Sequence, residues 1–96
     1  MLKHIVFMKF KPSVTQADID LLKKDLGGLP AAIPEIREFV FGQDILRTER
    51  SWDFALVSAF GDLEAMNRYQ VHPGHQVVLR KVRAMCEGLM VVDFES

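Results

Sequence analysis

Apolar residues gather in short runs in some segments of the chain and recur at helical spacing in others. The segment Lys3 to Lys11 is rich in Ile, Val, Phe and Met and stops at Pro12, which predicts a first strand. Thr15 and Asp18 have the spacing of a helix capping box, with Asp in place of the usual Glu. The apolar residues that follow recur at steps of three and four, which indicates one face of a helix that Pro30 closes. They are Ile19, Leu22, Leu26 and Leu29.

The middle of the chain predicts two strands joined by a charged connection. Residues 36–42 carry three consecutive apolar side chains and end at a glycine, which is typical of a second strand. Residues 43–51 hold Asp44, Arg47, Glu49 and Arg50 and predict a hairpin connection. Residues 52–60 are apolar again and stop at a glycine, which predicts the third strand.

A proline divides the helical part of the last third. Asp62 is suited to cap a short helix that passes through Tyr69. A residue before proline avoids helical backbone angles, so His72-Pro73 should interrupt that helix, and proline suits the first position of a new one. The new helix should end at Gly88, and Leu89 to Phe94 predicts a fourth strand. The apolar side of this helix consists of His75, Val78, Val82 and Met85.

The order strand–helix–strand, strand–helix–strand predicts an α+β fold. This is the β-α-β-β-α-β pattern of a ferredoxin-like sandwich with a four-stranded antiparallel sheet. A length of 96 residues suits one domain, so we assign residues 1–96 to a single unit. In this pattern the helices cover the same face of the sheet.

The predicted strands are apolar on both faces, although the helices can cover only one. In the first strand Val6, Met8 and Phe10 point one way, whereas Ile5 and Phe7 point the other. Large exposed apolar patches are rare unless something binds there. We therefore predict a homodimer in which two open sheet faces meet, forming a dimeric α/β barrel. The alternatives are a monomer with an apolar ligand groove and a flat sheet that tolerates scattered apolar residues.

Composition and charge narrow the possible functions. The net charge is −1 and the pI is about 6.3, which argues against a nucleic-acid-binding protein. No apolar run is long enough to span a bilayer, and the first residues do not form a signal-peptide core. The single cysteine, Cys86, excludes an internal disulfide. We expect a cytoplasmic protein that contacts neither membrane nor nucleic acid.

The segment around the predicted helix break holds the densest cluster of titratable side chains. His75 follows Pro73 on the apolar side of its helix, where burial and the positive helix end favour the neutral imidazole that acts as a general base. Tyr69 is the candidate hydroxyl donor to a carbonyl or oxyanion. The alternatives are structural: His72 as a helix cap and His75 as a satisfied, half-buried side chain. We expect no metal, because Pro73 separates the two histidines, and no cofactor, because no phosphate-binding loop is present.

The motif Tyr69-x-x-His72-Pro73-x-His75, together with the opening Lys3-His4-Ile5-Val6 and the closing Val92-Asp93-Phe94, resembles the stress-responsive A/B barrel domain (Dabb) family along the whole chain. The resemblance implies a ferredoxin-like fold that dimerises through the open sheet face. A plant polyketide cyclase of that family works without cofactor or metal. Its catalytic tyrosine and histidine match Tyr69 and His75, and a further site histidine matches His4.

Two functions are therefore predicted. In the first, the protein binds a small hydrophobic molecule between the sheet and the helices. In the second, it is a cofactor-independent enzyme of the cyclase, lyase or monooxygenase type acting on a carbonyl or polyketide-like substrate. His75 is then the base, Tyr69 polarises the carbonyl oxygen, and His4 orients His75 or the ligand. The predicted substrate-binding residues are Ile5, Phe7, Val57 and His72.

Overall fold

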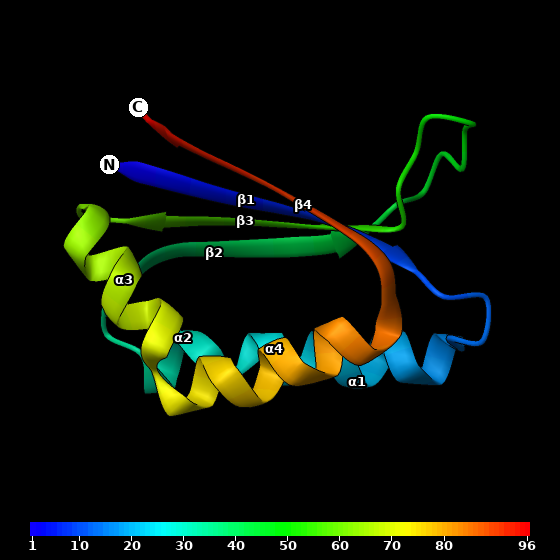
Figure 1. The fold of residues 1–96 in the computed structure, drawn as a ribbon, viewed down its shortest axis with the longest axis horizontal. Coiled ribbons are helices and arrows are strands. Elements are labelled where there is room, and N and C mark those ends of the chain that lie inside the picture. Colours follow the sequence, from blue (N-terminus) through cyan, green and yellow to red (C-terminus); the bar gives the residue numbers. More distant parts are fainter.

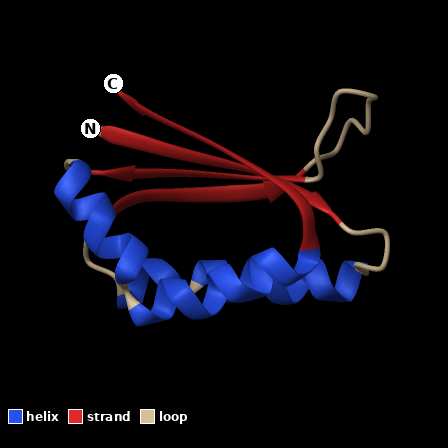
Figure 2. Cartoon of the chain, viewed as in Figure 1, coloured by secondary structure: helices blue, strands red, loops and turns tan.

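The structure is a computed structural model that describes all residues from 1 to 96. Its elements, in chain order, are β1 (Leu2–Phe10), α1 (Gln16–Gly27), α2 (Leu29–Ala32), β2 (Ile36–Gln43), β3 (Phe54–Phe60), α3 (Leu63–Val71), α4 (Pro73–Met85) and β4 (Cys86–Glu95). The strands form one antiparallel sheet in the order β2-β3-β1-β4. All helices lie on the same side of this sheet (Figures 1 and 2). The predicted ferredoxin-like α+β fold is thus confirmed.

Local sequence signals explain where the helices begin. The Thr15 side chain accepts a hydrogen bond from the Asp18 backbone N–H, and the Asp18 side chain accepts one from the Thr15 N–H, which completes the capping box. The Asp62 side chain caps α3 by accepting from the Ala65 N–H at 2.8 Å. His72 has an extended backbone and separates α3 from α4, as the following proline requires.

Two helix ends differ from the sequence predictions. Pro30 does not end the helical region, because it occupies the first turn of the short α2, where its missing N–H is harmless. Helix α4 ends at Met85, before Gly88, which lies inside β4. A side chain at position 88 would approach the Trp52 ring to 3.0 Å, so this glycine allows the ring to pack against the strand.

The main core lies between the sheet and the helices. Alternate residues of β1 point toward the helices, and of these Leu2, Met8 and Phe10 are buried in the core. In β3 the same face carries Phe54 and Leu56. None of the helices has the length and apolar character needed to cross a lipid bilayer.

The opposite face of the sheet carries apolar side chains that no helix covers. One row crosses all four strands, since directly paired residues of antiparallel strands share a face. It consists of Val40, Val57, Ile5 and Val92. Phe7 and Met90 form a neighbouring pair, and both are exposed. The two-sided strands predicted from the sequence are thus present, and we call this surface the open face.

Candidate functional site

A cavity of about 240 Å³ lies between the sheet and the helices. Most of its wall is apolar, and the sheet contributes Val6, Met8 and Leu56. Its lining also includes side chains that can exchange hydrogen bonds with a ligand, among them the three predicted as catalytic. These three are His4 from β1, Tyr69 from α3 and His75 from α4. An apolar cavity with a few convergent polar groups has the general character of a small-molecule site.

The Tyr69 hydroxyl faces this cavity. The side chain is 1 % exposed, and its ring packs against Phe60 and His75 at centroid distances of 4.8 and 4.3 Å. The hydroxyl forms no hydrogen bond within the protein, yet no fully occluded side-chain oxygen or nitrogen lacks a partner. The oxygen is therefore accessible from the cavity. Burial raises the pKa of Tyr69, so the group stays a phenol that can donate a hydrogen bond.

His75 presents an unprotonated nitrogen to the same cavity. Its Nδ1 lies 3.1 Å from the carbonyl oxygen of Gln70, and because a carbonyl only accepts, Nδ1 carries the proton. In the neutral ring, Nε2 is then the free base. Burial lowers the pKa of His75, the Gln70 carbonyl partly offsets this effect, and the positive charge of Arg83 lowers it further. The neutral, basic form is thus favoured near pH 7.

His4 is held by a carboxylate on the neighbouring strand. His4 and Asp93 are directly paired residues of β1 and β4, so their side chains share the helix-covered face. His4 Nδ1 is hydrogen-bonded to Asp93 Oδ1. This bond fixes the ring and leaves Nε2 for the cavity, where the His4 and Tyr69 ring centroids are 6.4 Å apart. The three residues predicted as catalytic are therefore brought together in one cavity.

The four residues predicted to bind substrate lie elsewhere. Side chains alternate along a strand, so Ile5, Phe7 and Val57 point to the open face rather than into the cavity beside Tyr69. The prediction that they wall this cavity is corrected. His72 Nδ1 accepts a hydrogen bond from the Gly74 N–H at 3.0 Å, which makes this side chain the cap of α4.

Other residues of the cavity escaped the sequence analysis. Leu79 and Arg83 line it from α4, one and two turns beyond His75, and Val91 lines it from β4. Leu79 and Arg83 lie four and eight positions after His75, a spacing that places all three on the same side of the helix. Asp93 occurs in the closing strand motif, but its contact with His4 depends on the pairing of the first strand with the last, which local spacing does not encode.

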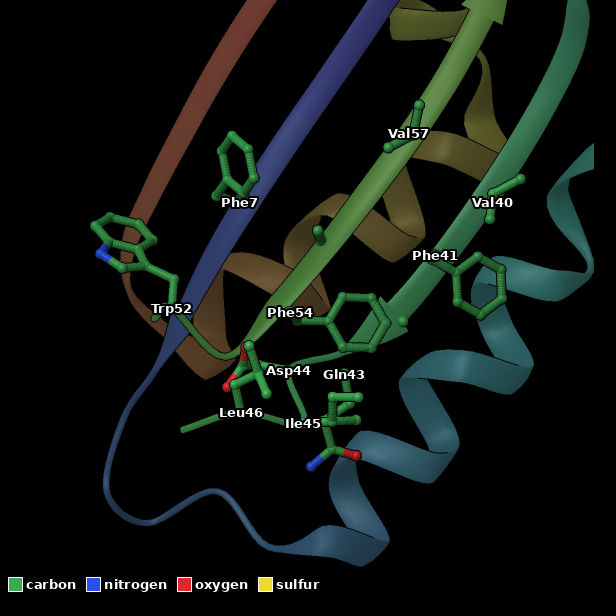
Figure 3. Close-up of a pocket in the computed structure, with 12 residues that line it drawn as sticks. Phe7, Val40, Phe41, Gln43, Asp44, Ile45, Leu46, Trp52, Phe54 and Val57 are labelled. Atoms are coloured by element: carbon green, nitrogen blue, oxygen red, sulfur yellow. The ribbon is translucent and has the colours of Figure 1, made fainter. Parts of the chain in front are cut away.

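A broader hollow of about 660 Å³ lies where the open face meets the β2–β3 loop. Figure 3 shows Phe7 and Val57 on the sheet above this loop, with Ile45 and Leu46 at its edge. The loop rises on the side of the sheet away from the helices (Figure 1). Ile45 and Leu46 are 87 % and 76 % exposed, an unusual state for two neighbouring aliphatic residues.

The β2–β3 loop is held by an ion-pair cluster. Arg47 donates hydrogen bonds to Asp44 at 3.3 Å and to Asp53 at 2.7 Å. Asp53 also accepts from the Phe10 N–H. Burial opposes ionisation of Asp53, but the hydrogen bonds from Phe10 and Arg47 outweigh it and lower the pKa of the carboxyl. The exposed position of Ile45 and Leu46 thus belongs to an internally bonded loop.

Fold and cavity together define a ferredoxin-like α+β protein with a ligand-sized space between its two layers. A family model described as Stress responsive A/B Barrel Domain matches residues 2–96, and the chain belongs to that family.

Relatives with names and solved structures agree with this assignment. Olivetolic acid cyclase of Cannabis sativa is 26% identical over 94 residues, which cover 96% of this chain and 93% of the cyclase. A dimeric ferredoxin-like protein of unknown function from Thermobifida fusca is 29% identical, with a TM-score of 0.92 over 99% of this chain and 90% of that one. The hydroxynitrile lyase of Passiflora edulis, 24% identical, shares the fold with a TM-score of 0.87 over 97% of this chain and 90% of the lyase.

Proposed function

We propose that this protein binds a small hydrophobic carbonyl compound in the cavity between the sheet and the helices. The observation that carries this proposal is the convergence of His4, Tyr69 and His75 on a mostly apolar cavity. A ligand there gains from burial of its apolar body, at about 25 cal/mol per Å² of apolar surface removed from water. Its carbonyl oxygen accepts a hydrogen bond from the Tyr69 hydroxyl, which has no partner in the protein.

The second candidate function is cofactor-independent proton transfer on the same ligand. It is favoured by the Nδ1–H of His75, which donates to the Gln70 carbonyl and leaves Nε2 as a base directed to the cavity. His75 Nε2 removes a proton from the carbon next to the carbonyl, and the electron pair of the broken C–H bond moves onto the oxygen. Tyr69 stabilises the resulting enolate by donating a hydrogen bond. The imidazolium then returns the proton to the product.

His4 has a supporting role in this scheme. Its hydrogen bond to Asp93 fixes the ring and turns Nε2 toward the cavity, where it accepts or relays a proton of the ligand. Similarity to olivetolic acid cyclase supports an enzymatic use of this cavity. Both reacting groups come from the chain, so the scheme requires no cofactor.

Exchange of protons for deuterium separates the two functions. An alkyl methyl ketone is incubated with the protein in D₂O, and NMR follows the loss of the protons beside the carbonyl. Catalysis predicts exchange well above the buffer rate, and His75→Gln should slow it about 10²-fold or more. His72→Asn, a change just outside the cavity that retains a capping side chain, is the matched control and should exchange at the wild-type rate. Saturable binding with no exchange would leave only the binding function.

We further propose that the open face is the interface of a homodimer. Several solved proteins of this fold are described as dimeric. Stacked sheets lie about 10 Å apart, so a loop that rises from the open face must lie beside the partner's sheet. This placement gives Ile45 and Leu46 an apolar surface to cover.

A further inference from the structure

The cavity has a cationic side chain at the end far from Tyr69. Positions 75, 78, 79, 82 and 83 of α4 have the spacing of a single helix face, and all five side chains line the cavity. The first four are His75 and three aliphatic residues, whereas the last is Arg83. Arg83 lies eight positions after His75, which corresponds to about 12 Å along a helix axis.

Arg83 has no partner in the protein. It takes part in none of the ion pairs, and its guanidinium forms no hydrogen bond. Lys81 on the same helix is bonded to Asp25 at 2.8 Å, away from the cavity. The charge of Arg83 nevertheless reaches into the site, since it is one of the causes that lower the pKa of His75. Arg83 is thus an exposed cation at the edge of an apolar cavity, without a carboxylate partner of its own.

The Asp93 carboxylate lies beside His4, at the end of the cavity opposite Arg83. Asp93 is bonded to His4, whereas the strand residue near the end of α4 is Leu89. Four residues of β4 separate Asp93 from Leu89, about 13 Å along a strand. The two ends of the cavity therefore differ in charge. The Asp93 carboxylate lies next to His4 at one end, and the Arg83 guanidinium lies at the other. An anionic ligand group is repelled from the first end and attracted to the second.

We propose that Arg83 binds the carboxylate of an elongated ligand whose apolar chain fills the cavity and whose opposite end lies between Tyr69 and His75. This inference rests on the proposed function, because it names the class of molecule that the cavity receives: an apolar chain of roughly 10 Å with one terminal carboxylate. A guanidinium is the side chain best matched to a carboxylate, because its N–H groups form two parallel hydrogen bonds.

Two ligands that differ only in charge test this proposal. Octanoate and octanamide have the same chain, and their affinities are measured by NMR titration at pH 7.5 and low ionic strength. Octanoate should bind about fivefold more tightly than octanamide, the range expected for an ion pair at a partly exposed position. Arg83→Gln should remove this preference, so that the variant binds both ligands with equal affinity. Arg80→Gln, which removes an exposed charge of the same helix outside the cavity, should keep the preference.

A second readout locates the ligand. The terminal methyl group of bound octanoate should give NOEs to the ring protons of Tyr69 and His75, since the carboxylate is held at the far end. Equal binding of both ligands, unaffected by Arg83→Gln, would overturn the role of Arg83 and leave the binding function intact. Failure of both ligands to bind would overturn both proposals.

Discussion

The rings of Tyr69 and His75 lie 4.3 Å apart between centroids and are tilted by 46°, although the two residues belong to different helices. They meet because His72 and Pro73 end α3 and start α4 within two residues, so that the last turn of one helix faces the first turn of the next. The helix break therefore builds the site. It places a phenol and an imidazole on one cavity without a long loop.

Replacing Tyr69 by phenylalanine should separate function from stability. The hydroxyl has no hydrogen bond within the protein, so Tyr69→Phe removes no internal bond and should change the free energy of unfolding by less than about 0.5 kcal/mol. Loss of the oxyanion donor should slow deuterium exchange of the ketone about 10²-fold. Urea unfolding and the NMR exchange assay measure the two effects. A large loss of stability with normal exchange would show that the hydroxyl serves the fold.

Protonation of His75 should determine how activity and stability decrease at low pH. Because burial holds its pKa below the ordinary value of 6.5 in the folded protein, the neutral base predominates at pH 6.5, and most of the decline in exchange should occur at lower pH. In the unfolded chain His75 takes up its proton near pH 6.5, so acidification through this value favours unfolding. Stability from this residue is present above pH 6.5 and is lost as the pH falls toward the folded pKa.

The matching measurement compares the wild type with His75→Gln. Urea unfolding of both proteins from pH 7.5 to 5 should show a smaller acid loss in the variant. An identical pH dependence in wild type and variant would contradict a lowered pKa for His75.

The cap of α4 should tolerate change as long as an acceptor remains. His72→Ala removes the acceptor for the Gly74 N–H and should destabilise the protein by about 1 kcal/mol, whereas His72→Asn should retain most of the stability. Neither substitution should alter affinity for octanamide, because the ring binds backbone rather than ligand. A loss of affinity in His72→Asn with normal stability would restore His72 as a ligand contact.

The sequence predicted the fold, Tyr69 and His75 because their signals are local, whereas the role of His4 was implied by the family resemblance. The capping box, the break at His72-Pro73 and the spacing of His75 from Val78 and Val82 each lie within a few neighbouring residues. The residues that form the apolar walls of the cavity were predicted incorrectly for a different reason. Ile5 and Phe7 alternate with His4 and Val6 in β1, and only the position of the helices decides which set faces the cavity.

The remaining part of the site could not be predicted from local spacing, because it depends on pairing between strands that are distant in the sequence. Asp93 meets His4 only because β1 is the neighbour of β4, and these residues are 89 positions apart. Arg83 carries a local signal, its eight-residue spacing from His75. Arg83 is exposed in the structure, however, and only the position of the sheet shows that it also borders the cavity.

A single charge on the open face should separate the dimer. Val57 occupies the middle of the apolar row, paired with Val40 on one side and Ile5 on the other. Val57→Asp would bury an unpaired carboxylate between two sheets, which costs several kcal/mol. Light scattering at micromolar concentration should give twice the 10.9 kDa chain mass for the wild type and the chain mass for the variant. Leu21→Asp places the same charge on an exposed aliphatic position of α1, outside the open face, and should remain dimeric. A wild-type mass of a single chain would refute the proposed interface, as would a Val57→Asp variant that stays dimeric.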